Sequence, residues 1–368
     1  MTTLFLYECS PPVGHHPEYL KHVAISSASR YENVVCIVPS SWRTASESLH
    51  VGSQFKFEWC FYDPDESHPD QYSFINRETL FLCMNSFAEP CQSDLYVLYS
   101  DPLIPSLFLL ILSWSLRDRL TIFQHHYSFL VSPIHHPLYF IKGLLKLIAI
   151  NSYCLLRAKA VFHFSFVKAF CLNSEVLPYP PSSSLSSHSC YDDSNQFARI
   201  KFLKTEGIPI LLCIGSFRAD KGFDIAVRST NLLKSQVCLV IAGPPSCFTK
   251  PELLRLRSDN SKSVLYVFDK FLSNDEYSTL ASLADIFLLP YSHTFCGESG
   301  PLVDSRSLGK ISVISNAVGL RLSIKQARGS SFTSSSLSPI DFSFAIDKAL
   351  SHLEYTRVTR NLSMRKCI

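Results

Sequence analysis

The stretch Gly215-Ser-Phe-Arg-Ala-Asp-Lys-Gly222 lies between an apolar run, Ile210–Ile214, and a helical pattern that begins at Phe223. This order predicts a strand, a short loop and then a helix. Glycines let a backbone approach a ligand closely, and a helix N-terminus presents free N–H groups with partial positive charge. Because the loop also contains Arg218 and Lys221, it is suited to holding phosphate. The alternative is a solvated loop with two surface cations.

Apolar runs alternate with helical patterns along the chain. In the second half, strands are predicted at residues 210–214, 237–242, 264–268, 285–290 and 311–314. In the first half, strands are predicted at residues 4–7, 34–38, 95–98, 120–123 and 160–164. Such runs are nearly continuously apolar, as in strands of a parallel sheet that is covered by helices on both faces. The sequence therefore predicts an α/β protein with two such domains in tandem.

A tract rich in proline and serine, residues 177–189, interrupts this alternation. Proline lacks a backbone donor and serine favours turns, so neither sustains a helix or strand. We therefore predict a first domain over residues 1–180, a linker over 181–205 and a second domain over 206–350. Residues 351–368 are predicted to form a C-terminal helix or tail.

The bulk composition excludes several classes of protein. Apolar residues make up 46% and charged residues 18% of the 368 residues, which is not the composition of a disordered chain. The net charge of +3 argues against nucleic-acid binding. The thirteen cysteines include no Cys-x-x-Cys pair, so metal-site spacing is absent and reduced thiols in a cytoplasmic protein are expected. The N-terminal residues lack the basic region of a signal peptide.

One apolar stretch, residues 137–156, has two interpretations. It contains Lys142 and Lys146 and is followed by Arg157 and Lys159. In the first interpretation, it is a cationic amphipathic helix in peripheral contact with an anionic membrane. In the second, it is a buried helix with two lysines at its edge.

Four further segments follow the phosphate-type loop in a fixed order. They are Leu239-Val-Ile-Ala-Gly-Pro244, Phe271-Leu-Ser-Asn-Asp-Glu-Tyr277, Ala284-Asp-Ile-Phe-Leu-Leu-Pro-Tyr291 and Ser299-Gly-Pro-Leu-Val-Asp304. Together with that loop, over about residues 208–320, they resemble glycosyltransferase family 4, which are retaining nucleotide-sugar transferases. The resemblance implies the GT-B fold, in which two Rossmann-type domains with parallel sheets face a central cleft.

The resemblance also implies roles for individual residues of the second domain. Arg218 and Lys221 would clamp the donor diphosphate and stabilise the charge that develops on it. For Arg218, the structural alternative is a surface ion pair with Asp220. The other implied donor-binding residues are Gly215, Ser216, Phe271, Leu272, Ser299, Gly300, Leu302 and Asp304.

The sequence departs from the family at one position. Family members usually carry a glutamate that contacts the transferred sugar, then seven residues, then a glutamate that binds the ribose. Asp304 occupies the second position, and an aspartate can still accept two hydroxyl bonds. Cys296 occupies the first position and cannot act as a carboxylate. Glu298, two residues away, is the candidate replacement and is included among the catalytic candidates.

The first domain resembles the family's acceptor domain more loosely. Gly14, His15 and His16 follow the first predicted strand and are candidates for acceptor binding. His125 and His126 end another strand, where many members place a histidine that faces the reacting centre. For both groups of histidines, a purely structural role is the alternative.

The predicted function is therefore that of a retaining glycosyltransferase. It would transfer a sugar from a nucleoside-diphosphate sugar to a glycan or lipid-linked acceptor, in polysaccharide or glycoconjugate synthesis. No cofactor or bound metal is expected, and no nucleic-acid partner. The displaced carboxylate motivates an alternative from another class, a non-catalytic sugar- or nucleotide-binding protein. A nucleotide-sugar epimerase is a third hypothesis, which would act on the donor without an acceptor.

Overall fold

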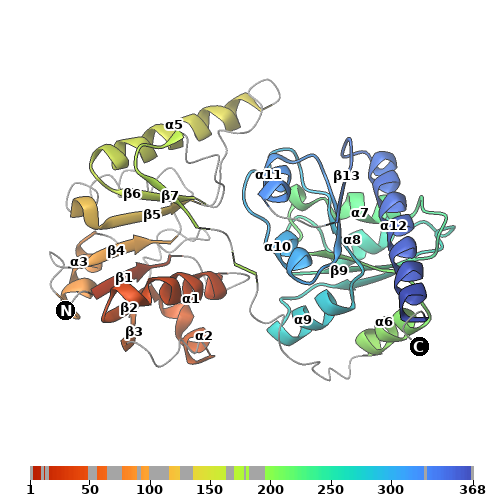
Figure 1. The fold of residues 1–368 in the computed structure, drawn as a ribbon, viewed down its shortest axis with the longest axis horizontal. Helices are drawn as coiled ribbons and strands as arrows, with labels where there is room; N and C mark the ends of the chain where they lie inside the picture. The colour runs from red at the N-terminus through yellow and green to blue at the C-terminus, as the bar shows by residue number, and fades with distance from the viewer. Residues whose placement is uncertain are drawn as a thin grey trace. The chain divides into compact units, whose positions relative to one another are not determined.

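The computed structural model describes residues 3–9, 12, 16–48, 56–63, 77–88, 93–98, 116–124, 136–162, 170–177, 180–181, 195–326 and 330–365. The chain divides into two compact units, Met1–Pro180 and Pro181–Ile368. Each unit is built on one parallel sheet with helices beside it (Figure 1).

The sheet of the first unit has the order β3-β2-β1-β4-β5-β6-β7, and every neighbouring pair is parallel. Its strands are β1 Thr3–Tyr7, β2 Asn33–Pro39, β3 Lys56–Tyr62, β4 Asp94–Val97, β5 Leu120–Gln124, β6 Lys159–Phe162 and β7 Ser174–Val176. Its α-helices are α1 His16–Ser27, α2 Arg43–Ser48, α3 Arg77–Asn85 and α5 Pro137–Leu155. All five residues of β1 are buried, because core clusters pack on both faces of this central strand.

The sheet of the second unit has the order β10-β9-β8-β11-β12-β13 and is also parallel throughout. Its strands are β8 Ile210–Ile214, β9 Cys238–Ala242, β10 Val264–Phe268, β11 Ile286–Leu289, β12 Ile311–Ile314 and β13 Ser331–Thr333. Its α-helices are α6 Asn195–Thr205, α7 Phe223–Thr230, α8 Lys250–Arg255, α9 Asn274–Leu283, α10 Gly300–Ser307, α11 Val318–Gln326 and α12 Pro339–Arg365.

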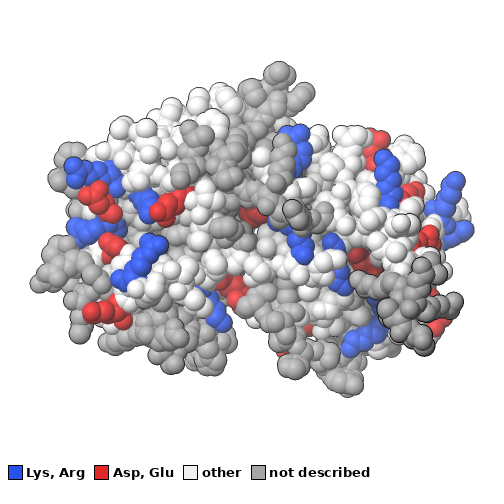
Figure 2. Space-filling model, viewed as in Figure 1, with Lys and Arg blue, Asp and Glu red and all other residues white. Residues whose placement is uncertain are grey.

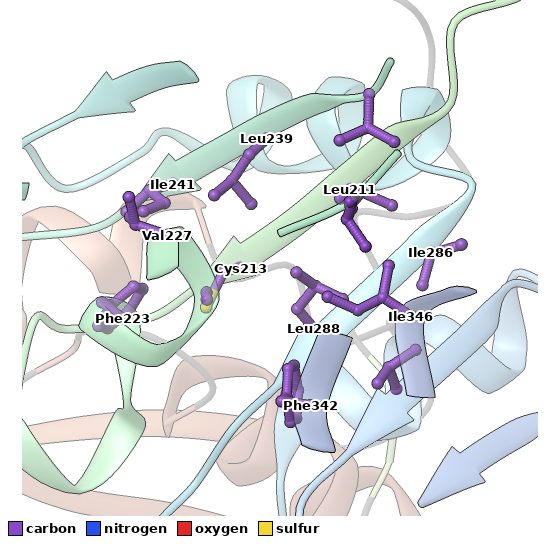
Figure 3. Close-up of a cluster of buried hydrophobic side chains, with 14 of the residues drawn as sticks. Leu211, Cys213, Phe223, Val227, Leu239, Ile241, Ile286, Leu288, Phe342 and Ile346 are labelled. Atoms are coloured by element: carbon purple, nitrogen blue, oxygen red, sulfur yellow. The ribbon is translucent and has the colours of Figure 1, made fainter. Parts of the chain in front are cut away.

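Apolar side chains from the sheet and from helices α7, α8 and α12 form the larger core of the second unit (Figure 3). Alternate residues of each strand point to one face, as the period of a strand requires. On this face they meet residues of α7 and α12; the labelled set is Leu211, Cys213, Phe223, Val227, Leu239, Ile241, Ile286, Leu288, Phe342 and Ile346. Burying each large apolar side chain contributes roughly 1.5–3 kcal/mol. Helices α6 and α9 contribute to a second cluster, packed with the other strand residues.

The carboxylate of Asp285 joins three parts of the second unit. It accepts hydrogen bonds from Lys204 Nζ at 2.5 Å and from Arg357 Nη2 at 2.9 Å, and its second oxygen accepts one from the Ile210 amide at 3.0 Å. Lys204 lies on α6 and Arg357 on α12. The helices at the beginning and the end of this unit are therefore fastened to the sheet at one side chain.

The structure departs from the sequence-based boundaries at three places. Residues 195–205 of the expected linker form helix α6, whose Phe197 and Ile200 are buried. The C-terminal helix begins at Pro339 and crosses residue 350. Strands β3, β7 and β13 were not predicted; all three are edge strands, and β7 and β13 are only three residues long.

Candidate functional site

The strand order of the second sheet reverses between the neighbouring strands β8 and β11. From β8 the chain proceeds to β9 and β10 on one side, and from β11 to β12 and β13 on the other. Loops that leave the carboxyl ends of two such strands diverge, and ligands of open α/β sheets bind at that point. The segment Gly215–Gly222 follows β8, and the segment that begins at Pro290 follows β11. The loop singled out in the sequence therefore lies at the switch point.

Backbone contacts hold these loops together. Gly222 has φ +65°, and a Cβ at this residue would lie 2.1 Å from the carbonyl oxygen of Pro290. Gly243, at the end of β9, has φ +150°, and a Cβ there would lie 1.9 Å from the carbonyl oxygen of Gly215. The Ser292 amide also donates to the carbonyl oxygen of Asp220 at 2.8 Å. Only glycine fits at Gly222 and Gly243, so both glycines position the loops.

The ammonium of Lys221 lies over two aromatic rings from the loop after β11. Its Nζ is 3.7 Å from the ring centroid of Tyr291 and 4.4 Å from that of Phe295. Desolvation, and then repulsion from Arg218, lower the pKa of Lys221 to about 7, although Asp220 acts in the opposite direction. Ring faces attract a cation, so the same rings hold the ammonium in place. The Lys221 amine is therefore held in position, and its charged form is costly without a further anion.

The guanidinium of Arg218 forms a forked ion pair with Asp220. Nε donates to Oδ1 at 2.9 Å and Nη2 donates to Oδ2 at 2.7 Å. The Arg218 side chain is nevertheless 43% exposed. The ion pair with Asp220, which was the structural alternative for Arg218, is therefore present. It holds the guanidinium within the loop that also contains Lys221.

The N-terminus of α10 lies beside these rings. Ser299 is the N-cap, and its Oγ accepts a hydrogen bond from the Leu302 amide at 3.4 Å. The Ser299 hydroxyl also donates to the Tyr291 hydroxyl at 3.3 Å. Gly300 and Leu302 are buried in the first turn. The structure therefore brings Ser299 together with the β11 loop that holds Lys221.

Asp304 lies inside the fold rather than at its surface. It is completely buried on α10, and its Oδ2 accepts a short hydrogen bond from the Tyr277 hydroxyl on α9. In the sequence, Tyr277 was identified only as the last residue of the segment 271–277, and its contact with Asp304 was not predicted. The two residues are 27 positions apart, so no local pattern indicates their pairing, and the sheet order brings α9 and α10 together.

The Glu298 carboxylate is directed toward α11. Its Oε1 accepts a hydrogen bond from Ser323 at 2.7 Å and lies 3.7 Å from Nη2 of Arg306. Its Oε2 is buried with no hydrogen-bond partner among the described residues. Burial raises the pKa of Glu298 to about 7, while Ser323 and Arg306 act against this rise. Cys296, the residue at the family's glutamate position, is also buried.

The segment before α9 presents an aromatic ring at the surface. Phe271 is 62% exposed, whereas Leu272 packs against the second core. A capping box fixes the segment: the Glu276 amide donates to the Ser273 hydroxyl at 3.2 Å, and the Ser273 amide donates to the Glu276 carboxylate at 2.8 Å. Phe271 is therefore available for stacking.

In the first unit, the structure describes one of the histidines that the sequence singled out. His16 begins α1, and its Nδ1 lies 3.6 Å from Oε2 of Glu8. Glu8 is buried directly after the central strand β1, where the sheet order reverses between β1 and β4. Sequence reasoning missed Glu8, although an acid at the end of a central strand was a usable signal. Gly14, His15, His125 and His126 lie outside the described residues.

Within the described parts of the chain, no group of three or more histidine, cysteine, aspartate or glutamate side chains is arranged to hold a metal ion. The arrangement at the end of β8 and β11 instead offers a lysine, an arginine and a capped helix N-terminus. These groups bind anions.

Several solved structures with the same architecture are of glycosyltransferases. HepE from Anabaena, in complex with UDP, has a TM-score of 0.63 and 14% identity, covering 95% of this chain and 90% of that chain. A glycosyltransferase from Rickettsia africae has a TM-score of 0.62 and 13% identity, covering 96% and 89%. Trehalose-6-phosphate synthase from Burkholderia multivorans has a TM-score of 0.62 and 11% identity, covering 99% and 94%.

These similarities show the fold. The chain is an α/β protein of the GT-B fold, with two Rossmann-like domains, as its sequence predicts. No protein-family model and no curated protein matches the sequence. Membership of glycosyltransferase family 4 therefore stays a prediction.

Proposed function

We propose that the protein is a retaining glycosyltransferase that binds a nucleoside-diphosphate sugar at the carboxyl ends of β8 and β11. One observation carries this proposal: Lys221 is held at the switch point by Tyr291 and Phe295, beside Arg218. A cation kept in a partly desolvated place gains most from a ligand with concentrated negative charge. A diphosphate is such a ligand.

The same groups suit the chemistry of sugar transfer. When the anomeric C–O bond breaks, its electron pair passes to the diphosphate oxygen, which gains negative charge. Cations that are already in place stabilise this charge more in the transition state than in the ground state. Lys221 supplies a point charge, and Arg218 supplies a planar donor once Asp220 shares it with the phosphate.

Two further elements of the donor site follow from this placement. Ser299 and the amides at the start of α10 would contact the distal phosphate, and exposed Phe271 would border the base. HepE structures contain UDP and UDP-glucose, which makes uridine the first base to test. Asp304 would reach the ribose only if Tyr277 released it.

The first unit would bind the acceptor, which we propose is a glycan or a lipid-linked sugar in polysaccharide or glycoconjugate synthesis. His16, with the neighbouring Gly14 and His15, would contribute to that site, and His125 and His126 would face the reacting centre. The proposed reaction needs no bound metal, since the two cations of the second unit serve the leaving group.

Isothermal titration with UDP, GDP and ADP tests the donor site. We expect at least one nucleotide to bind, and Lys221→Ala to weaken its binding about tenfold or more, because a charge-assisted contact to phosphate is lost. Lys262→Ala is the matched control, since Lys262 is exposed on a loop elsewhere in the second unit and its loss should leave the affinity unchanged. A folded protein that binds none of the three nucleotides would contradict the proposal.

A non-catalytic nucleotide-binding protein is the second candidate, and the Glu298 geometry favours it. The carboxylate that should meet the sugar is engaged with Ser323 and Arg306. Release of UDP from UDP-sugars, measured with and without glycan acceptors, separates the two functions. Nucleotide binding without turnover of any donor would support the binding protein.

A further inference from the structure

Helix α5 has one buried face and one exposed apolar face. Its buried side packs on the first sheet through Ile150, Tyr153 and Cys154, and Tyr153 belongs to the core around β5. The opposite side repeats at intervals of three and four residues, which places its members in one stripe along the helix. These residues are Leu138, Ile141, Leu144, Leu145, Ile148 and Leu155, and they are 43–76% exposed.

A second segment extends this stripe at the C-terminal end of the helix. The Asn151 side chain donates to the Phe170 carbonyl oxygen at 3.0 Å and accepts from the Leu172 amide at 3.3 Å. Phe170 and Leu172 are themselves exposed apolar residues. We call the six helix residues with Phe170 and Leu172 the α5 face.

The exposed apolar side chains of the first unit are clustered on the α5 face and are not scattered over its surface. Eleven large apolar side chains are exposed among the described residues of the first unit, and eight of them belong to this face. The surface over α5 is mostly white in Figure 2, with the charged side chains of this view gathered elsewhere. Contiguous apolar surface of this kind marks an interaction site.

The charges beside the face determine its partner. Residues 137–159 contain no aspartate or glutamate, and Lys142 is exposed at the edge of the stripe with no ion pair to a described acidic residue. Arg157 pairs with Asp118 at 3.5 Å and Lys159 with Glu175 at 2.5 Å, both beyond the end of the helix. In a symmetric dimer, the α5 face of one copy would contact the α5 face of the other. Because this helix has no acidic residue, such a contact would give Lys142 no carboxylate to pair with. An anionic lipid surface supplies the negative charge and receives the apolar side chains.

We propose that the α5 face docks the protein on the surface of a bilayer that contains anionic phospholipid. Leucine and isoleucine side chains enter the boundary between headgroups and acyl chains, while Lys142 contacts the headgroups. The helix lies in the plane of the interface, with its inner side still packed on the sheet. Among the described residues no helix is both long and apolar enough to cross a bilayer. The surface goes beyond the proposed transferase activity, and it would place the first unit next to an acceptor carried on lipid.

Vesicle co-sedimentation with the full chain tests this docking. Wild-type protein is expected to sediment with phosphatidylcholine vesicles that contain phosphatidylglycerol, and less with phosphatidylcholine alone. The double variant L145E/I148E should reduce the bound fraction about tenfold or more, because two charges must enter the interface. Lys142→Glu should reduce binding about fivefold or more, and only to the anionic vesicles.

The matched control is F344E/V358E, which adds two glutamates on α12 of the second unit. Phe344 and Val358 are also exposed, at 60% and 58%, and their replacement should leave vesicle binding unchanged. Unchanged melting temperatures show that the variants fold. The assay contains no nucleotide, so its outcome does not depend on the donor site.

Four outcomes would overturn the proposal. The first is wild-type protein that stays in the supernatant with both vesicle types, and the second is L145E/I148E that sediments like wild type. A dimer that separates on Leu145→Glu in light scattering would make the α5 face a contact between copies. Equal sedimentation with neutral and anionic vesicles would contradict the role assigned to Lys142.

Discussion

At the scale of single residues, the position of Lys221 has a measurable protonation consequence. Burial and Arg218 lower its pKa to about 7 in the ligand-free protein, with Asp220 and Cys213 acting in the opposite direction. A bound diphosphate would favour the charged form and raise this pKa again. Between pH 7 and the ordinary pKa of a lysine, Lys221 should therefore take up a proton when a nucleotide binds. The affinity for the nucleotide should fall as the pH rises through this range.

We expect an uptake of up to about one proton at pH 8, measured by titration calorimetry in two buffers of different ionisation enthalpy. Lys221→Arg is the informative variant, since arginine stays charged throughout this range. It should retain nucleotide binding and lose the proton uptake. Equal uptake by wild type and Lys221→Arg would assign the titration to another group.

A second residue-scale prediction concerns two thiols of the first unit. The Cys60 thiol on β3 donates a hydrogen bond to Cys83 on α3 and lowers the pKa of Cys83 to about 7. Burial instead raises the pKa of Cys213 and of Cys238. Because the thiolate is the reactive form, iodoacetamide should modify Cys83 at pH 7 well before those two buried cysteines.

Peptide mapping by mass spectrometry gives the rate at each cysteine. Cys60→Ala removes the hydrogen-bond donor. The pH at which the modification rate of Cys83 is half-maximal should therefore rise toward the ordinary thiol pKa of about 8.5. An unchanged pH profile in Cys60→Ala would show that the hydrogen bond does not set the reactivity.

At the scale of elements, the close approach of the loops after β8 and β11 predicts a stability difference between two glycines. Gly222 and Gly309 have nearly the same φ, +65° and +63°, but only Gly222 has a backbone atom where a Cβ would lie. Gly309→Ala should cost about 1 kcal/mol for the left-handed conformation alone. Gly222→Ala adds the clash with Pro290 and should cost about 2 kcal/mol more.

Urea unfolding of both variants measures the difference. Gly222→Ala should also weaken nucleotide binding, because the loops that carry Lys221 and Tyr291 would separate. Equal losses of stability in the two variants would mean that the Pro290 contact relaxes without cost.

The elements also show where local sequence was sufficient. Buried strands such as β8, β9 and β11 are unbroken apolar runs, and a parallel sheet covered on both faces requires such runs. The three-residue edge strands β7 and β13 are only partly buried, so pairing with a neighbour defines them and their own composition does not. Helix α6 follows a proline- and serine-rich tract that obscured its pattern.

At the scale of the whole molecule, the class of fold was predictable and the contacts of the site were not. Alternation of strand and helix patterns predicted two parallel sheets, and both are present. The rings over Lys221 depend on β11 pairing with β8 across more than seventy residues, and no local pattern encodes that order. Counting along the motif likewise located Cys296 and Asp304, with Glu298 as the nearby replacement. It could not give the directions of the Glu298 and Asp304 carboxylates, which α11 and α9 determine.

The carboxylate of Asp285 sets a limit on how far the chain can be shortened. Its two cationic partners stand 153 positions apart, on Lys204 and Arg357, and the Ile210 amide completes the cluster. A fragment that stopped at residue 350 would retain the acid and one lysine but lose the arginine, and one that started at residue 206 would lose the lysine. Limited proteolysis should therefore trim this half of the chain no further than the segment from α6 to Arg357 while it remains folded.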